Sequence, residues 1–296
     1  MPSKQFESLV AMMRARPIDP DASIERLREN FERIVPLLPT PPDVRIEKTH
    51  LGARAAEIFT PPTVRSDAIL LFFHGGGYCI GSLNTHRHFT ALLAKSASIR
   101  AVALDYRLAP EHPFPAALDD ALAAYRSLVK RGVPPARIVL AGDSAGGGLT
   151  LATLIALRDA ADEVPAAAVC LSPWTDLANT GASVLTRAAA DPLLSLRELE
   201  TFAPRYLGST DPRHPLASPL YADLAGLPPL LVHVGGNEIL LDDSLRLVER
   251  ANAAGVDVTF RLDEEMIHVW HYFAPLIPEG QDAVDHVGEW IRGRVS

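Results

Sequence analysis

The chain alternates short apolar runs with longer segments in which apolar residues recur at helical spacing. Short runs that end at turn residues predict strands, and the runs at 68–73 and 138–141 are wholly apolar, as in strands buried on both faces. The predicted strands cover 44–48, 53–59, 68–73, 100–106, 138–141, 167–171, 230–234 and 256–262. From the third onward they mostly alternate with helical segments, which predicts an α/β fold with an eight-stranded, mostly parallel sheet flanked by helices.

Two parts of the chain depart from this alternation. Residues 3–14 and 21–35 have helical periodicity and are separated by a proline-containing break at 17–20, so two amino-terminal helices are predicted. Between 191 and 221 a further helical segment is followed by a turn-rich stretch. We predict a main core of 45–190 and 222–296, and a helical cap of 1–44 and 191–221. The apolar side chains of the cap either line a substrate site or pack its interior; they include Phe6, Met12, Met13, Phe202 and Leu207.

The strand at 138–141 runs directly into a glycine-rich turn and then into a helical segment. The turn reads Gly-Asp-Ser-Ala-Gly over 142–146, so glycines stand two residues on either side of Ser144. A sharp strand-to-helix turn of this kind holds the serine hydroxyl clear of the sheet, and neighbours without side chains leave its approach open. The pattern indicates a nucleophilic serine, and the alternative is an ordinary glycine-rich turn.

A second glycine-rich segment, His-Gly-Gly-Gly-Tyr over 74–78, follows the strand at 68–73 and favours the nucleophile. Acyl transfer puts negative charge on the former carbonyl oxygen, and backbone without side chains can bring N–H groups within hydrogen-bonding distance of it. We expect Gly75, Gly76 and Ala145 to donate these N–H groups, Ala145 because it follows the nucleophile and begins a helix. The alternative is that the three glycines only form a flexible loop.

A serine nucleophile needs a histidine to take its proton and a carboxylate to orient that histidine, here in the chain order serine, acid, histidine. Glu238 follows the strand at 230–234 and is the predicted acid. Asp242 and Asp243 are the alternatives, although carboxylates in a first helical turn commonly only complement the helix dipole.

His268 is the first histidine after the strand at 256–262 and is therefore the predicted base, with His271 as the alternative. Histidines at short spacing can also hold a metal ion, and the pairs 268/271 and 86/88 have such spacing. Neither pair has an acidic or cysteine ligand nearby at a recognised zinc spacing, so no metal is predicted.

Composition and charge narrow the class of protein. The formal net charge of -8 predicts no basic surface for nucleic acid or anionic membranes. No apolar stretch approaches the roughly 18 to 20 residues of a membrane span, and the first residues lack the apolar segment of a secretion signal. We therefore expect a cytoplasmic protein without a stable membrane anchor. The two cysteines do not require a disulfide; Cys79, beside the glycine-rich segment, is either a packing residue or a thiol near the site, and Cys170 lies in an apolar run.

The segments 74–78 and 142–146, together with the sequence from Asp105 to Asp120 between them, closely resemble the hormone-sensitive-lipase family of microbial carboxylesterases, a branch of the α/β-hydrolases. The resemblance extends from about residue 68 onward, whereas the first 45 residues match only in being helical. It implies an α/β-hydrolase fold, no cofactor, a preference for short acyl chains over long triglycerides, and a possible homodimer formed through the last strand.

The chain departs from the family pattern at two places. Family members commonly carry aspartate followed by Pro-Leu at the acid position, where this chain has Glu238 followed by Ile-Leu. After the matching histidine, His268, a glycine and an aromatic residue usually follow; here Val269 and Trp270 stand instead. We expect the bulkier residue at 269 to narrow the pocket.

These residues predict a serine carboxylesterase that hydrolyses short-chain acyl esters through an acyl-enzyme. Ser144 attacks, His268 removes and returns the proton, and Glu238 orients His268. The expected partner is a small-molecule ester. An amidase, a peptidase or an acyltransferase on the same residues is an alternative, because the pocket selects the leaving group. A non-catalytic ligand receptor on this fold is another, although its triad is usually broken.

Overall fold

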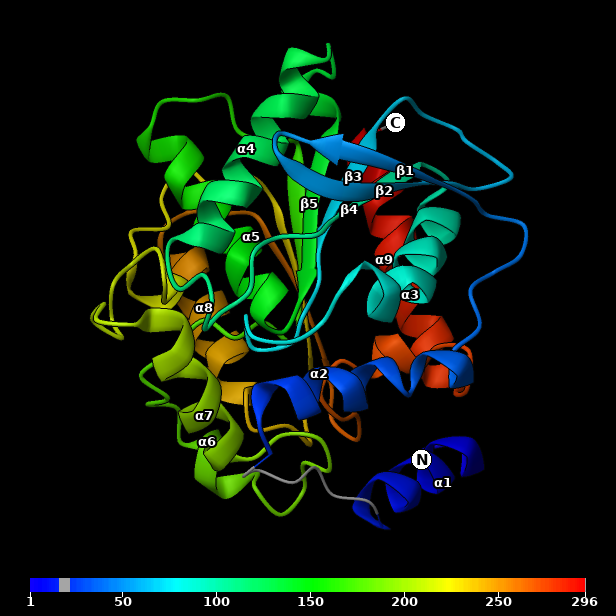
Figure 1. Ribbon diagram of the computed structural model, residues 1–296, viewed down its shortest axis with the longest axis vertical. Helices are drawn as coiled ribbons and strands as arrows, with labels where there is room; N and C mark the ends of the chain where they lie inside the picture. Colours follow the sequence, from blue (N-terminus) through cyan, green and yellow to red (C-terminus); the bar gives the residue numbers. More distant parts are fainter. Residues whose placement is uncertain (16–21, 296) are drawn as a thin grey trace.

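An eight-stranded sheet forms the centre of the computed structural model, which describes residues 1–15 and 22–295 (Figure 1). The strand order is β1-β2-β4-β3-β5-β6-β7-β8, and only the β1/β2 and β2/β4 pairs are antiparallel. The strands are β1 (Arg45–Leu51), β2 (Arg54–Thr60), β3 (Ile69–Phe73), β4 (Arg100–Leu104), β5 (Ile138–Asp143), β6 (Ala167–Leu171), β7 (Leu230–Gly235) and β8 (Val258–Asp263). The predicted sheet is confirmed, and the ends of its strands differ from the sequence prediction by no more than three residues.

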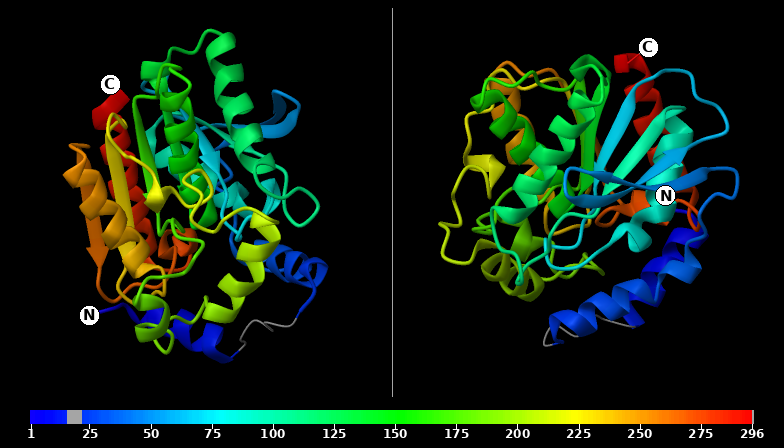
Figure 2. Two further views of the ribbon diagram at one scale, coloured as in Figure 1. Left: turned by 90° about the vertical axis from the view of Figure 1, so that its left-hand side faces the viewer. Right: turned by 45° about the horizontal axis from the view of Figure 1, so that its top comes forward.

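Helices cover both faces of the sheet (Figures 1 and 2). One face carries α3 (Leu83–Ala97) and α9 (Pro278–Val295), and the other carries α4 (Ala116–Lys130), α5 (Ala145–Asp159) and α8 (Leu241–Ala253). Successive side chains of a strand point to opposite faces, so each strand feeds two cores. The strand residues Leu71 and Leu140 pack in the cluster on the α5 face, whereas their neighbours Leu70 and Val139 pack in the cluster on the α3 face. Burial on both faces explains the wholly apolar runs.

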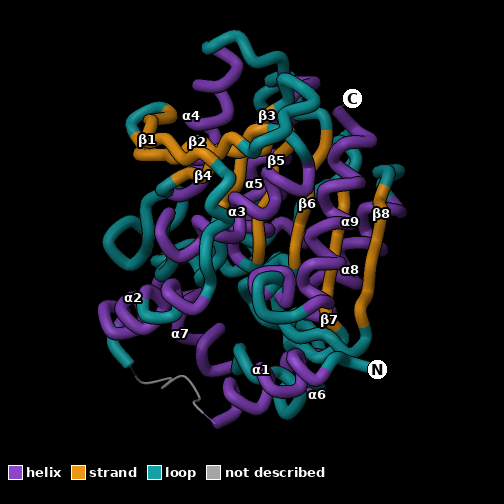
Figure 3. The backbone as a smooth tube through the Cα atoms, turned by 90° about the vertical axis from the view of Figure 1, so that its right-hand side faces the viewer, coloured by secondary structure: helices purple, strands orange, loops and turns teal. Residues whose placement is uncertain are grey.

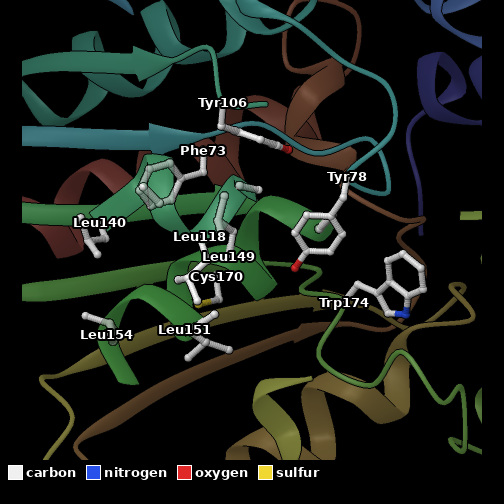
Figure 4. Packing of buried hydrophobic residues seen from close by; sticks show 14 of the residues in the cluster. Phe73, Tyr78, Tyr106, Leu118, Leu140, Leu149, Leu151, Leu154, Cys170 and Trp174 are labelled. Atoms are coloured by element: carbon white, nitrogen blue, oxygen red, sulfur yellow. The ribbon is translucent and has the colours of Figure 1, made fainter. Parts of the chain in front are cut away.

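Part of the cluster on the α5 face is drawn in Figure 4, where Leu149 and Leu151 of α5 gather with Cys170 of β6. The cluster continues toward the end of the sheet through the aromatic side chains of Tyr78 and Trp174, both almost completely buried. The core therefore extends directly beneath the glycine-rich segment that follows β3.

Further helices gather beyond the end of the sheet at which the parallel strands finish (Figures 1 and 3). They are α1 (Lys4–Ala15), α2 (Ile24–Glu32), α6 (Ser183–Thr186) and α7 (Leu196–Leu207). The helices α1, α2 and α7 come from the segments predicted as a cap, and α6 comes from residues assigned to the core. The predicted break at 17–20 and the predicted helix start at residue 21 lie outside the described residues, and the cap boundaries stay a prediction.

Short 3-10 helices complete the chain: Val35–Leu37, Pro135–Arg137, Pro219–Tyr221 and Trp270–Phe273. The last of these begins two residues after the predicted base, His268. Among the helices of the described residues, none combines the length and the apolar character that crossing a membrane requires.

Candidate active site

Ser144 is the single residue between β5 and α5, and it lies in the sharp turn that its flanking glycines predict. Its backbone has φ 53° and ψ -122°, outside the regions that side chains normally allow. A Cβ atom at Gly142 would lie 2.2 Å from the carbonyl oxygen of Gly146, and one at Gly146 would lie 2.0 Å from that of Phe73. Both positions therefore require glycine. The Ser144 N–H donates to the carbonyl of Leu171 at 2.8 Å, which ties the strained turn to β6.

The three glycines after β3 form a tightly packed turn, which argues against a flexible loop. The Gly75 N–H donates to Asp143 Oδ1 at 3.0 Å, and a Cβ at Gly75 would lie 2.3 Å from Asp143 Oδ2. Gly76 has φ 116° and Gly77 has φ 57°, conformations that favour glycine. Within the described part of the chain, the N–H groups of Gly76 and Gly77 have no hydrogen-bond acceptor. Of the predicted oxyanion donors, Gly75 is thus already engaged by a carboxylate.

His74 supports this turn from inside the core. Its ring stacks on Tyr106 with the centroids 4.3 Å apart, and its backbone carbonyl accepts the Tyr106 hydroxyl at 2.7 Å. Burial, and then the neighbouring His86, lowers the pKa of His74 to about 3. The imidazole is therefore neutral at physiological pH and acts as a packing group beneath the glycines.

The amino-terminal helix α2 also holds the glycine turn. Arg28 donates from Nε to the carbonyl of Cys79 at 2.8 Å and from Nη2 to the carbonyl of Ala109 at 3.0 Å. Its guanidinium also binds both carboxylate oxygens of Glu111, at 2.7 and 2.8 Å. Arg28 therefore joins the glycine turn to the segment 105–120. Burial raises the pKa of the Cys79 thiol to about 12, which favours its interpretation as a packing residue.

Glu238 and His268 meet in the loops that follow β7 and β8. His268 Nδ1 lies 3.1 Å from Glu238 Oε1, and Glu238 is completely buried. The other carboxylate oxygen, Oε2, accepts the Ser172 hydroxyl at 2.8 Å and the Gly235 N–H at 2.9 Å. With Nδ1 directed at the carboxylate, Nε2 is the ring nitrogen available to a serine hydroxyl.

Opposing effects act on the pKa of His268. Burial is the largest single effect and lowers the pKa. The charge of Glu238, the hydrogen bond to it and the charges of Asp191 and Asp143 together raise the pKa by more, so the net pKa lies above the ordinary value. The surroundings therefore favour the imidazolium that forms when His268 accepts a proton.

The alternative acids are engaged elsewhere. Asp243 Oδ2 accepts the N–H groups of Thr175 at 2.7 Å and Asp176 at 2.8 Å, and Asp242 Oδ2 accepts the Ser183 N–H at 2.9 Å. Asp243 holds the loop after β6 against the start of α8, and Asp242 holds the first residue of α6 there. Neither has a hydrogen bond to the predicted base in the residues that the structure describes.

The alternative base, His271, faces away from the carboxylate. Its Nε2 lies 2.9 Å from His233 Nδ1, and His233 Nε2 lies 2.9 Å from His286 Nδ1, so three imidazoles form a chain toward the surface. Burial lowers the pKa of His271 far below its ordinary value. His271 is therefore a buried neutral group and not a partner of Glu238.

The remaining histidine pair also separates in space. His86 Nε2 lies 3.4 Å from Asp143 Oδ2, whereas His88 Nε2 lies 2.9 Å from the carbonyl of Tyr272. The two rings therefore have different partners and do not converge on a common point.

Sequence reasoning missed two residues of this site. Ser172 directly follows β6 and contacts Glu238, and the only available signal was its place at the carboxyl end of a strand. Asp191 served only as a cap boundary; in the structure it is buried, its Oδ2 accepts the Ile239 N–H at 3.0 Å, and its charge acts on His268. No local pattern marks Asp191, because it lies far along the chain from its partners.

Known proteins are similar to this chain in both sequence and structure. A family model described as alpha/beta hydrolase fold matches residues 70–272. An acetyl-hydrolase of Streptomyces hygroscopicus is 52% identical over 231 residues, which cover 78% of this chain and 77% of that protein. An esterase of Acinetobacter venetianus is 36% identical over 286 residues, 96% of this chain and 94% of that protein. The crystal structure of an esterase from the bacterial hormone-sensitive lipase family has a TM-score of 0.97 at 46% identity, and the match covers 100% of both chains.

The chain belongs to the hormone-sensitive-lipase family of α/β-hydrolases. The predicted fold and the prediction of an esterase are confirmed. In this hydrolase, Val269 has φ 47° where the family usually has glycine, and its side chain is buried in the cluster on the α3 face. The extra bulk at 269 is therefore packed into the core.

The five apolar residues predicted in the cap have different surroundings. Phe202 of α7 packs on the glycine turn, since a Cβ at Gly77 would lie 2.5 Å from its ring. Phe6 and Leu207 are buried in core clusters, Met13 is partly buried, and Met12 is exposed. Among these five, Phe202 is the side chain that contacts the glycine turn.

Proposed function

We propose that this hydrolase cleaves carboxylic esters of short acyl chains through an acyl-enzyme formed on Ser144. The observation that carries the proposal is the hydrogen-bonded pair of Glu238 and His268, at the same end of the sheet as the strained serine turn. An ester is uncharged, so its binding requires no charged side chain in the pocket. The names of the relatives, acetyl-hydrolase and esterase, support a small acyl group.

The reaction proceeds in two halves. The Ser144 hydroxyl attacks the ester carbonyl carbon while His268 Nε2 takes its proton, and the tetrahedral intermediate then expels the alcohol, which receives that proton. A water molecule, deprotonated by His268, attacks the acyl-enzyme, and collapse of the second intermediate releases the acid and returns the proton to Ser144. Glu238 keeps the Nδ1 proton of His268 directed at its own carboxylate and stabilises the transient imidazolium.

The oxyanion forms next to the glycine turn and the start of α5. We assign its donors to the N–H groups of Gly76, Gly77 and Ala145. The Gly75 N–H, also predicted from the sequence, could donate to the oxyanion only if its bond to Asp143 broke. In this assignment Asp143 instead anchors the turn through Gly75, and the next two N–H groups, which have no acceptor in the described residues, are left to bind the oxyanion.

Replacing Ser144 by alanine tests the nucleophile. We expect Ser144→Ala to lower kcat for p-nitrophenyl acetate by a factor on the order of 10³ to 10⁶, because no other group can form the acyl-enzyme. The matched control is Ser218→Ala, which removes another buried serine hydroxyl, one bonded to Pro212 and Leu177. Undiminished hydrolysis by Ser144→Ala would overturn the proposal.

Two substrate series test which acyl chain and which leaving group the enzyme prefers. With p-nitrophenyl esters of increasing length, kcat/KM should be highest for the shortest acyl chains. A matched acetyl amide should be hydrolysed far more slowly than the acetyl ester, and the opposite order would favour an amidase or peptidase.

A further inference from the structure

Ser172 connects the loop of the acid with the loop of the base. It directly follows β6 and is completely buried. Its hydroxyl donates to Glu238 Oε2 at 2.8 Å and accepts the Val269 N–H at 3.1 Å. Because Val269 directly follows His268, one side chain holds the carboxylate after β7 and the backbone beside the imidazole after β8.

The backbone on both sides of this connection is strained. Ser172 and Val269 each have φ 47°, a left-handed conformation that is unfavourable for residues with a side chain and least favourable for a β-branched one. Such strain persists only where surrounding bonds hold it. The Ser172 N–H donates to the carbonyl of His233 at 2.8 Å, so the serine is fixed to β7 through its backbone as well.

The contacts of Glu238 show what the Ser172 hydroxyl adds. The Gly235 N–H also donates to Oε2, at 2.9 Å, but Gly235 belongs to the same strand end as Glu238 and can fix the carboxylate only relative to β7. Ser172 supplies the second donor from a different strand and at the same time accepts a bond from the loop after β8. Its removal would free the carboxylate to rotate away from His268 Nδ1 and would leave the buried Val269 N–H without this acceptor.

We propose that Ser172 is a positioning residue, whose hydroxyl sets the distance and orientation between Glu238 and His268. It acts through these two groups and does not touch the ester. The inference rests on the proposed function, in which His268 is the base and Glu238 its orienting acid. No atom is transferred to or from Ser172 in either half of the reaction.

Two variants distinguish the effect of losing the Ser172 hydroxyl from the effect of relieving the backbone strain. Ser172→Ala removes the hydroxyl and keeps the strained backbone, whereas Ser172→Gly removes the hydroxyl and relieves the strain. The control is Ser218→Ala, because Ser218 is also completely buried, and its hydroxyl also donates to one group and accepts from one N–H. Kinetics with p-nitrophenyl acetate across pH and thermal unfolding are measured for all three.

We expect both Ser172 variants to lose about 10- to 100-fold in kcat with KM changed less than about twofold, because misplaced catalytic groups slow the chemical step more than binding. The acid limb of kcat/KM should move to lower pH, since a displaced Glu238 raises the pKa of His268 less. Ser218→Ala should lose thermal stability but keep its kcat and its acid limb.

Either of two results overturns the inference. The first is a folded Ser172→Gly that keeps wild-type kcat and acid limb, which would make the hydroxyl merely structural. The second is an acid limb that moves to higher pH, which would mean that the hydroxyl disperses the charge of Glu238 instead of holding it in place. Ser144→Ala separates failure of the proposed function from failure of the positioning role. If Ser144→Ala stays active, the proposed function fails. If Ser144→Ala is inactive but the Ser172 variants keep wild-type activity, only the positioning role fails.

Discussion

At the scale of single residues, the charges around His268 set its pKa and with it the pH range in which the proposed base is neutral. Burial alone would lower the pKa of its imidazole, as it does at His271 and His74. At His268 the buried Glu238, 3.1 Å from the ring, acts together with Asp191 and Asp143 to reverse the direction of the shift. The same residue type is thus a neutral packing group at two positions, whereas at the third its surroundings favour the protonated form.

The raised pKa of His268 predicts the pH dependence of the reaction. A base must be neutral to accept a proton, so kcat/KM should rise with pH, with a midpoint above the ordinary histidine value of about 6.5. Glu238→Gln removes the attraction while burial remains, so the midpoint should move to lower pH and the plateau should fall on the order of 10²- to 10⁴-fold. The pH–rate profile for p-nitrophenyl acetate measures both. The control is Asp242→Asn. Asp242 accepts a bond from Ser183 and has none to His268 in the described structure, so this variant should leave the midpoint unchanged. Equal pH–rate profiles for the two variants would contradict the assignment of Glu238 as the acid.

At the scale of elements, Asp243 attaches α8 to the loop that follows β6. Its Oδ2 accepts the N–H groups of Thr175 and Asp176, and its Oδ1 is buried without a partner in the described structure. Burial raises the pKa of Asp243 to about 7, although these two N–H groups oppose the shift. The connection between the elements therefore keeps a carboxyl group protonated where the unfolded chain would ionise it.

This shift predicts how Asp243→Asn changes stability with pH. Between the ordinary pKa of 3.8 and about 7, the unfolded chain loses the Asp243 proton while the folded chain keeps it, so the free energy of unfolding falls as pH rises through that window. Asparagine keeps an acceptor for Thr175 and Asp176 but does not ionise. The Tm of Asp243→Asn minus that of the wild type should therefore increase from about pH 5 to about pH 7 and then level off. A difference independent of pH, measured by scanning calorimetry, would contradict the shift.

At the scale of the whole molecule, the sheet has an edge at β8, which pairs with β7 alone in the described structure. The Leu230 N–H donates to Asp257 and the Gly236 N–H to Asp263, so the odd-numbered residues from 257 to 263 bond toward β7. The backbone groups of residues 258, 260 and 262 consequently point outward. An open edge of this kind can pair with a second copy.

We propose that β8 forms the homodimer that the family resemblance implies. Sedimentation velocity should then give twice the chain mass of 32.0 kDa. Leu262→Pro removes an outward N–H without breaking a bond to β7, and edge strands tolerate proline, so this variant should sediment as a monomer. Leu262→Ala keeps the N–H and should remain dimeric. A wild-type protein that stays monomeric at every concentration would contradict the proposal.

The sequence by itself determined the features that depend on neighbouring residues. Burial on both faces demands unbroken apolar runs, and those runs placed β3, β5 and β6 almost to the residue. The turn around Ser144 requires glycine at 142, where a Cβ would lie 2.2 Å from the Gly146 carbonyl oxygen of the same turn, and glycine at 146, where it would lie 2.0 Å from the Phe73 carbonyl oxygen. Strand ends also placed Glu238 and His268, since parallel strands bring their carboxyl ends to one edge.

Only the tertiary structure decided which polar groups meet. It directed the Gly75 N–H to Asp143, engaged Asp242 and Asp243 with distant loops, and turned His271 toward His233. It also brought Ser172 and Asp191 to the acid and base. These contacts join residues that are separated along the chain by dozens of positions, and a hydrogen bond depends on distances and angles that the folded backbone sets. No pattern of apolar and polar positions contains that information.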